Sequence, residues 1–305
     1  MRKVKKVETR NRSIPRWKLS RYVWIYTFLL PVCTSLVLFR LYPLARTIWL
    51  AFFRWDIHEQ GWVGLQNFFT LFQSTLFQKT ILHTFQYTIL VVIAWLFSSL
   101  WVAVGIHHWR KSAKAIIRSA FYLPHLVGVV VLTLVWAWVF EPQIGLANQL
   151  LNIINIGPVL WLQKPQIALW SVILSSVLVV PGSGVVIYSA ALAGIPKVYA
   201  EVADVEGASA WQRFLYVTLP LLKPASLYLL VIYTIAGFQV FERVYLLTGG
   251  GPVNATTTIV QTIYKTAFRD ANYGLASAQS VVLLVLIGLV TWAYFRWLGQ
   301  DVHFD

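Results

Sequence analysis

The stretch that decides the fold is IPKVYAEVADVEGASAWQRFLYVTLPLLKP, residues 195–224. It is a polar segment with an acidic first half, and long apolar runs precede and follow it. It is about as long as a membrane is thick, yet charged residues recur along it. A chain that otherwise consists of apolar runs has no packing reason to carry such a segment. We therefore expect it to meet a partner on the water side of a membrane.

The rest of the chain has the composition of a membrane protein. Of its 305 residues, 58% are hydrophobic and 12% are charged, and the mean hydropathy is +0.66. Six apolar runs without charged residues can each hold the roughly 20 residues of a membrane-spanning helix. The predicted fold class is an all-α integral membrane protein with six transmembrane helices. The six runs are Tyr22–Phe39, Thr80–Trp109, Ser119–Phe140, Pro165–Pro196, Pro224–Phe241 and Ala271–Phe295.

Three further stretches without charge are too irregular to face lipid, where every backbone polar group must be paired internally. Residues 60–78 contain five Gln or Asn, residues 142–163 contain two Pro and two Gly, and residues 244–264 contain Thr248-Gly249-Gly250-Gly251-Pro252. We predict that these stretches are external connections with short interfacial helices.

Lys and Arg are distributed unevenly along the chain. Nine of the 25 lie in residues 1–21, and with the N-terminus inside, 17 fall on the inner side of the membrane and eight on the outer side. This bias predicts that both termini are cytoplasmic in a multi-pass inner- or plasma-membrane protein. It also explains the net charge of +14 without nucleic acid as a partner.

These patterns divide the sequence into five predicted parts. A basic cytoplasmic tail (1–21) precedes the first transmembrane helix (22–42) and an external loop (43–78). A five-helix core follows (79–298), and it contains a cytoplasmic loop at 195–222. The last part is a short cytoplasmic tail (299–305).

Residues 196–216 predict two short helices joined at a glycine, and we call this segment the elbow. Pro196 suits the first turn of a helix, and Gly207 suits the left-handed residue that ends it. Ser209-Ala210-Trp211-Gln212 predicts a capping box that opens the second helix. The first helix has an apolar stripe at Val198, Val202 and Val205. Its acidic residues would repel phosphate, which excludes a DNA-binding helix–turn–helix.

The elbow resembles the EAA signature of the inner-membrane permeases of binding-protein-dependent ABC importers. That signature reads E-A-A, three residues, G, nine residues, I-x-L-P. Here Glu201-Val202-Ala203, Gly207 and Val217-Thr218-Leu219-Pro220 occupy its positions, with Val202 in place of Ala and Val217 in place of Ile. Shorter pieces in the same order along the chain resemble the sugar-type branch. They include Phe28-Leu29-Leu30-Pro31, Val63–Phe68 and Thr248–Pro252.

The resemblance implies the type I ABC importer permease fold and a set of partners. Two permease subunits, usually a non-identical pair, enclose a path for a mono- or oligosaccharide. Two ATPase subunits bind below, and an extracytoplasmic binding protein delivers the solute above. The elbow is implied to be the coupling helix that meets the ATPase. The residues implied in coupling are Glu201, Ala203, Asp204, Gly207, Ala208, Leu219 and Pro220.

The sequence lacks the motifs of nucleotide, metal and catalytic chemistry. No G-x-x-x-x-G-K-[ST] loop is present, so a separate subunit must hydrolyse ATP, and we expect neither enzymatic activity nor a bound cofactor in this chain. The adjacent His107 and His108 would diverge by about 100° on a helix, so we predict no metal site there.

Candidates for the solute path are polar or aromatic residues near the breaks in the spans. Pro181-Gly182-Ser183-Gly184 interrupts span four, where Ser183 can contact solute or the break can be a packing kink. Trp136 can stack on a sugar ring or anchor its helix at the membrane interface.

The other candidates are Gln239 and Glu242, near the outer end of span five, although an ion pair with Arg243 would explain Glu242 equally well. The polar residues do not separate a sugar from glycerol phosphate, a polyamine or an anion. An ion-coupled secondary transporter would need acidic residues within the membrane, and the cores of the six runs contain none.

Overall fold

A computed structural model describes residues 16–56 and 60–299. Contacts divide the chain into two units, residues 1–49 and 50–305. In the first unit, helix α1 (Arg16–Leu36), the π-helical turn η1 (Val37–Leu41) and helix α2 (Tyr42–Leu50) follow one another without interruption. The helix thus passes the predicted boundary at residue 42. The π turn explains this, because it widens the backbone directly before Pro43, whose ring would otherwise meet the preceding turn.

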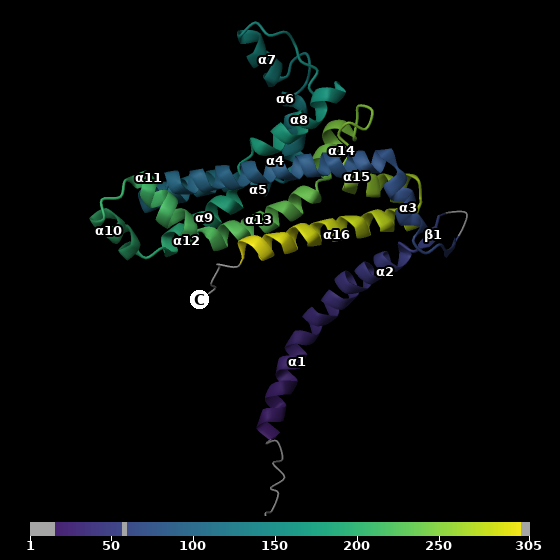
Figure 1. Cartoon of the computed structure of the whole chain (residues 1–305), viewed down its shortest axis with the longest axis horizontal. Helices are drawn as coiled ribbons and strands as arrows, with labels where there is room; N and C mark the ends of the chain where they lie inside the picture. Colours follow the sequence, from purple (N-terminus) through teal and green to yellow (C-terminus); the bar gives the residue numbers. More distant parts are fainter. Residues whose placement is uncertain (1–15, 57–59, 300–305) are drawn as a thin grey trace, which may run out of the picture. The chain divides into compact units, whose positions relative to one another are not determined.

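The second unit contains a small hairpin and the remaining helices (Figure 1). Its elements are β1 (Phe53–Trp55), β2 (Gln60–Trp62), α3 (Gln66–Gln73), α4 (Thr75–Gly105), α5 (Lys111–Val127), α6 (Val129–Val139), α7 (Leu146–Ile153), α8 (Pro165–Val177), α9 (Gly182–Gly194), α10 (Lys197–Val205), α11 (Ala210–Arg213), η2 (Phe214–Thr218), α12 (Leu219–Leu221), α13 (Lys223–Phe238), α14 (Glu242–Thr248), α15 (Ile259–Tyr264), η3 (Lys265–Arg269) and α16 (Tyr273–Leu298).

The described chain has four helices long and apolar enough to cross a membrane: Trp24–Leu50, Thr75–Gly105, Lys223–Thr248 and Tyr273–Leu298. Two bent helix pairs raise the number to six if each pair is one span. The first pair, α5 and α6, bends by 80° at Gly128, and the second, α8 and α9, bends by 45° after Val177. The three irregular stretches carry short helices (α3, α7, α14 and α15), as predicted.

Helix α4 lies at the centre of the second unit and packs against α8, α9 and α13, which in turn packs on α16 (Figure 1). Its buried face carries threonines one helical turn apart, at Thr80, Thr84 and Thr88. The Thr84 hydroxyl donates to the Thr80 carbonyl and accepts from the Ile259 amide at 3.0 Å. Small polar residues are typical of helix interfaces in membranes. Lipid tails are as apolar as leucine side chains, so the hydrophobic effect does not drive helices together there, and close packing and hydrogen bonds do so instead.

The hairpin pairs β1 with β2 in antiparallel register, Phe53 opposite Trp62. The Asn67 side-chain amide, on α3, donates to the carbonyls of Ala51 and Phe53 at 2.8 and 2.9 Å. Both β1 and α3 contact α16. The compact unit therefore begins at Leu50, whereas the sequence predicted a core beginning near residue 79.

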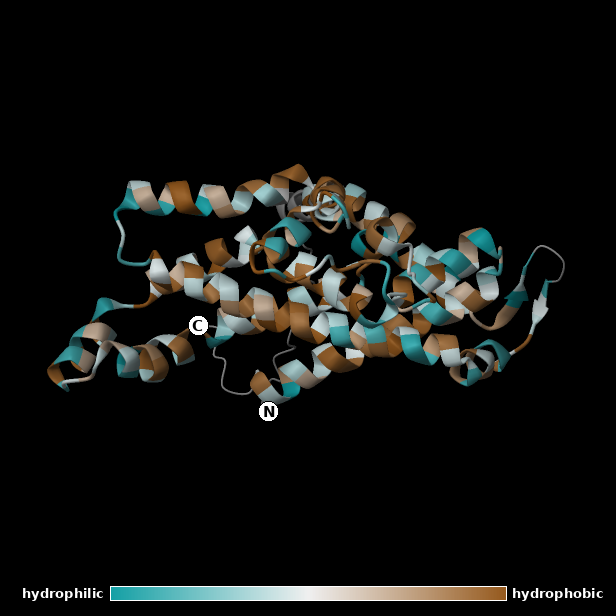
Figure 2. Cartoon of the chain, turned by 90° about the horizontal axis from the view of Figure 1, so that it is seen from above, coloured by the Kyte–Doolittle hydropathy of each residue, from teal (hydrophilic) through white to brown (hydrophobic). Residues whose placement is uncertain are grey.

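The two ends of this unit differ in character from its middle. The hairpin and α3 lie at one end and the elbow at the other, in both views (Figures 1 and 2). Hydrophobic residues predominate along the long helices between them, and hydrophilic residues are frequent at both ends (Figure 2).

Candidate functional site

The first helix of the elbow, α10, begins and ends on defined backbone contacts. Pro196 is its N-cap, one residue before the predicted place in the first turn. Gly207 has φ +71°, the left-handed conformation predicted for it. The Gly207 amide donates to the Asp204 carbonyl at 3.2 Å, and the Ala208 amide donates to the Ala203 carbonyl at 2.9 Å. These two bonds form a Schellman motif, which satisfies the last carbonyls of the helix.

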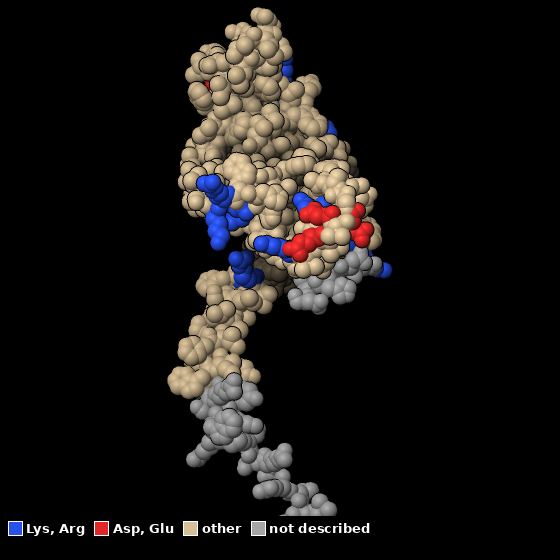
Figure 3. Space-filling view, turned by 90° about the vertical axis from the view of Figure 1, so that its left-hand side faces the viewer, with Lys and Arg blue, Asp and Glu red and all other residues tan. Residues whose placement is uncertain are grey.

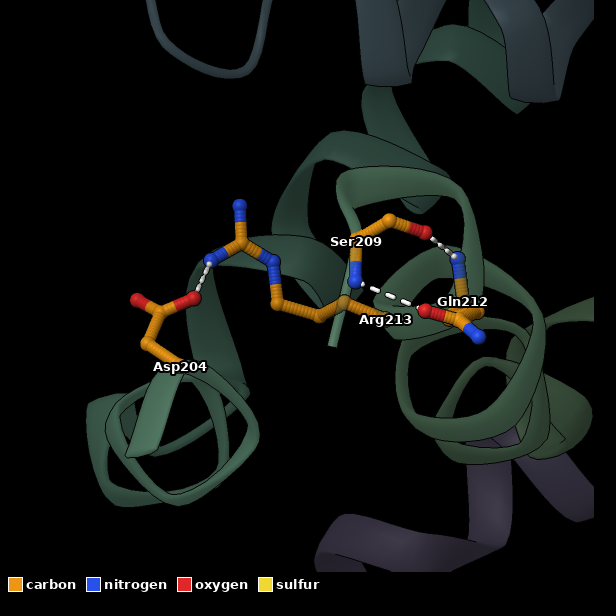
Figure 4. Close-up of polar contacts among 4 residues, drawn as sticks. All are labelled: Asp204, Ser209, Gln212 and Arg213. Carbon is orange, nitrogen blue, oxygen red and sulfur yellow. Dashed lines mark hydrogen bonds and ion pairs between the residues drawn. The ribbon is translucent and has the colours of Figure 1, made fainter. Parts of the chain in front are cut away.

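The second helix of the elbow opens with the predicted capping box (Figure 4). The Ser209 amide donates to Gln212 Oε1 at 2.8 Å, and the Gln212 amide donates to Ser209 Oγ at 3.3 Å. Only Ser209 separates α11 from the Schellman residue Ala208, so the chain has little freedom at the corner. The sequence therefore builds a bent segment whose angle is set by backbone hydrogen bonds on both sides.

An ion pair also joins the two helices of the elbow. Arg213 Nη1 on α11 lies 2.8 Å from Asp204 Oδ1 on α10 (Figure 4). The Asp204 side chain is 61% exposed, so the pair contributes on the order of 0–1 kcal/mol to stability. Its effect is mainly geometric, because it connects the two helices on the outside of the glycine corner. The sequence analysis did not identify this pair, although the opposite charges flank Gly207.

The predicted coupling residues differ in exposure. Glu201, Asp204 and Gly207 are exposed, as are Leu219 and Pro220, while Ala208 is half-buried. Ala203 is buried, which leaves room there for only a small side chain. Acidic side chains gather on the surface at this end of the molecule, with Lys and Arg beside them (Figure 3).

The apolar stripe of α10 has no partner within the described chain. Val198 is 62% exposed, Val202 is 55% exposed and Val205 is 89% exposed. Three exposed valines on one helix face, next to three carboxylates, form a surface that suits contact with another protein.

Beyond the elbow the helix continues through Pro220 into α13. The π-helical turn η2 ends two residues before Pro220, just as η1 ends two residues before Pro43. Leu222 is fully buried, and Pro224 lies in the first turn of α13. Leu219-Pro220 thus lies in a helical segment that links the elbow to the fifth span with little slack.

The break in the fourth span frees backbone carbonyls, and neighbouring helices satisfy them. The Val179 amide donates to the Ser176 carbonyl instead of continuing the α-helical pattern, so the Ser175 carbonyl lacks its helical donor. Arg243 Nη1 donates to this Ser175 carbonyl at 2.6 Å. Trp95 Nε1 donates to the Ser176 carbonyl at 2.9 Å. A broken helix is tolerated within a membrane when side chains re-pair its backbone in this way.

Close packing accompanies the break. A Cβ at Gly184 would meet the Tyr233 hydroxyl, and it would lie 2.6 Å from Ser99 Oγ. Ser99 Oγ in turn donates to the Pro181 carbonyl at 3.4 Å. This geometry supports the packing-kink interpretation of Pro181–Gly184, while solute contact at Ser183 stays a prediction.

The four candidates for the solute path lie on four different helices or at their ends. Gln239 is exposed at the end of α13, and Glu242 is exposed at the start of α14, where a carboxylate is favourable for the helix dipole. Ser183 is half-buried in the first turn of α9. Trp136 is half-buried on α6, and its ring packs against Phe140 with 5.3 Å between centroids. Within the described chain, no hydrogen bond or ring contact joins these four residues to one another.

The sequence analysis did not predict the burial of Arg243 or its contact with α8. Arg243 is 7% exposed, and its guanidinium contacts α8 through Ser175, not Glu242. The cation thus lies at the carbonyl end of α8, where it is favourable for the helix dipole. The proposed ion pair between Glu242 and Arg243 is not formed among the described residues.

The histidine pair lies beyond the end of the second span, because α4 ends at Gly105. The rings of His107 and His108 meet edge to face, with 5.0 Å between their centroids. Within the described residues no group of three or more His, Cys, Asp or Glu side chains could hold a metal ion.

The sequence matches a family model described as "binding-protein-dependent transport system inner membrane component" over residues 96–304. The chain belongs to this family.

Similar permeases extend the match to nearly the whole chain. The chain is 33% identical over 302 residues to the probable ABC transporter permease protein YesP of Bacillus subtilis, covering 97% of this chain and 96% of that protein. It is 29% identical to the sulfoquinovosyl glycerol transport system permease protein SmoG of Agrobacterium fabrum, covering 95% and 96%. It also resembles a crystal structure of a bacterial ABC transporter involved in the import of the acidic polysaccharide alginate. That likeness has a TM-score of 0.83 and 26% identity over 95% of this chain and 100% of that chain.

One feature of this inner membrane component could have been found earlier in its sequence. Ser171, Ser175 and Ser176 interrupt an otherwise apolar run, and this pattern marks a helix that packs on other helices. The exposure of the valine stripe needed the structure, because sequence spacing gives a face but not its partner.

Proposed function

We propose that this chain is the membrane-spanning permease subunit of an ATP-driven ABC importer that moves a carbohydrate. In this proposal six helices cross the membrane, with each bent pair counted as one span, and both termini lie in the cytoplasm. A second permease subunit, a pair of ATPase subunits and an extracytoplasmic binding protein complete the transporter. The chain itself hydrolyses no ATP and binds no cofactor.

One observation carries the coupling role: the elbow is ordered by its own backbone contacts but leaves its binding face unoccupied. Its corner is held by a Schellman motif and a capping box, which a flexible tether would not need. Its valine stripe has no partner within the described chain, and the exposed carboxylates of Glu201 and Glu206 lie beside that stripe. A rigid segment with a free apolar face fits the helix-in-groove mode of recognition.

The connections of the elbow suggest how force would reach the membrane. α9 leads directly into α10, and the helix that begins at α11 leads through η2 and α12 into α13. Both α9 and α13 pack on α4. Movement of the elbow by a closing ATPase would therefore tilt spans four and five against the second span. Alternating access would be a change between two packings of one bundle, biased by nucleotide bound elsewhere.

The carbohydrate assignment rests on the proteins that this chain resembles. SmoG is a permease for sulfoquinovosyl glycerol, and the solved transporter imports alginate. Both solutes carry sugar rings. Trp136, Gln239, Glu242 and Ser183 are the residues that we propose for the path.

A second candidate is an anionic solute, and Arg243 favours it. The guanidinium donates through Nη1 to Ser175, and no carboxylate of the described residues forms an ion pair with it. A buried cation without a carboxylate partner would attract a negatively charged group and repel a polyamine. An acidic sugar would be both a carbohydrate and an anion, and would therefore agree with both candidates.

The test is uptake by proteoliposomes that contain the chain, its partner permease, the ATPase and the binding protein. Neutral oligosaccharides, uronates, glycerol phosphate and a polyamine are compared in parental transporter and in Arg243→Met. The proposal expects ATP-dependent uptake of a sugar, with selective loss of acidic sugars in the variant if the second candidate is right. Uptake of only the polyamine would refute both candidates.

A further inference from the structure

A crevice of about 440 Å³ lies behind the elbow, outside the surfaces described above. Its apolar walls include Val104 near the end of α4, Leu192 near the end of α9 and Phe214 at the start of η2. Because α4 and α9 are membrane-spanning segments that end here, the crevice opens at the depth where lipid headgroups begin.

The polar part of the crevice is basic. His107, His108, Lys197 and Arg213 line it, and no carboxylate appears among its described lining residues. Arg213 is neutralised by Asp204, which leaves Lys197 and the histidine pair to act on a ligand. These basic side chains come from the α4–α5 connection and from α10, so the fold brings them together from distant parts of the chain.

Further positive charges reach this corner from α5. The pKa of His107 is lowered from its usual value, first by burial and then by the positive charges of His108, Lys114 and Arg118. Arg118 Nε is enclosed by the protein and has no hydrogen-bond partner. Both observations show that positive charge is concentrated beside the crevice, within the part of the chain that the structure describes. An anion bound nearby would relieve it.

We propose that this crevice binds the headgroup of an anionic phospholipid. The phosphate contacts Lys197 and the histidine pair, and the start of an acyl chain lies against the apolar wall formed by Val104, Leu192 and Phe214. Free phosphate would use the basic side chains but leave the apolar wall exposed to water, so the combination favours a lipid. Basic pockets between transmembrane helices are sites of this kind. A lipid held there contacts α9 and α10 together and stabilises the joint through which the elbow moves.

The test is native mass spectrometry of the full-length chain purified in detergent. Dioleoyl-phosphatidylglycerol is the probe, and phosphatidylcholine with the same chains and inorganic phosphate are compared with it. We expect one tightly retained phosphatidylglycerol per chain, and retention about fivefold weaker in Lys197→Gln, the effect of one interfacial positive charge. The double variant His108→Gln/Lys197→Gln should retain less still. Lys164→Gln, an exposed lysine before α8, is the matched control and should retain the lipid as the parent does.

Four outcomes would overturn the proposal. Equal retention of phosphatidylcholine would show that charge is not recognised, and displacement by millimolar inorganic phosphate would show a free-anion site instead. Equal loss in Lys164→Gln would show that the lysines act through general charge. If the charge variants do not fold, Ala200→Trp serves instead, because Ala200 lines the crevice and a large ring there should exclude the lipid. Undiminished phosphatidylglycerol in that variant would also reject the site.

Discussion

Replacing Gly207 by valine should uncouple the transporter without unfolding the chain. Gly207 has φ +71°, and no atom lies within 4 Å of the place where a Cβ would stand. The cost is therefore backbone strain alone, about 1–2 kcal/mol for a residue with a side chain in the left-handed region. That shifts the local equilibrium away from the bent elbow by about five- to thirtyfold. Asparagine tolerates this conformation, so Gly207→Asn should lose much less.

The assay is binding-protein-stimulated ATP hydrolysis and solute uptake in proteoliposomes that contain the assembled transporter. Gly207→Val should insert at the parental level and lose most of both activities, with Gly207→Asn intermediate. The matched control is Gly64→Val. Gly64 has φ +58° in the loop after the hairpin, and a Cβ there would meet only Trp62 Nε1, at an ordinary contact distance of 3.9 Å. It carries the same kind of strain far from the elbow and should couple normally. Parental uptake in Gly207→Val, or equal loss in Gly64→Val, would refute the elbow mechanism.

Three other outcomes follow from the structure. Glu201→Cys should crosslink to a cysteine-bearing ATPase subunit, whereas Gly64→Cys should not; crosslinking to the solute-binding protein instead would put the elbow on the wrong side of the membrane. Gly184→Ala should lower the thermal stability by about 1–3 kcal/mol through overpacking against Tyr233 and Ser99, while Gly194→Ala, where no atom lies within 4 Å, should change it little. The contribution of His107 to the free energy of unfolding should be complete above about pH 6.5 and should decrease as the pH falls below that value. The reason is that the pKa of His107 is lowered in the native state, so the unfolded chain binds the proton more readily. The thermal melting curve of His107→Gln should lose this part of the pH dependence; an unchanged slope would assign it to other groups.

The parts of the fold that the sequence predicted correctly are those with local causes. Gly207 and the Ser209–Gln212 capping box depend on contacts within six residues, so their residue types carry the information. The apolar runs predicted where long helices lie for the same reason, because each run satisfies its own backbone. The sequence predicted the ends of these helices less accurately, as Pro43 shows. A proline normally stops a helix, but a π turn before it lets the helix continue.

The features that sequence reasoning missed depend on contacts between distant residues. Arg243 has Glu242 beside it in the sequence, yet its guanidinium reaches Ser175, which lies 68 residues away. The threonine stripe of α4 was missed for another reason. Within a membrane, hydrophobic periodicity does not distinguish the buried face of a helix from the lipid-facing one, and small polar residues carry that information instead. Their four-residue spacing at Thr80, Thr84 and Thr88 was visible in the sequence.

The central claim is that this permease takes its driving force from a separate ATPase through the elbow. The most direct measurement is solute accumulation in sealed proteoliposomes, with the permease subunits alone and with the ATPase and binding protein added. The account predicts accumulation against a gradient only when ATPase, ATP and binding protein are all present. Accumulation by the permease subunits alone, with or without an ion gradient, would contradict it.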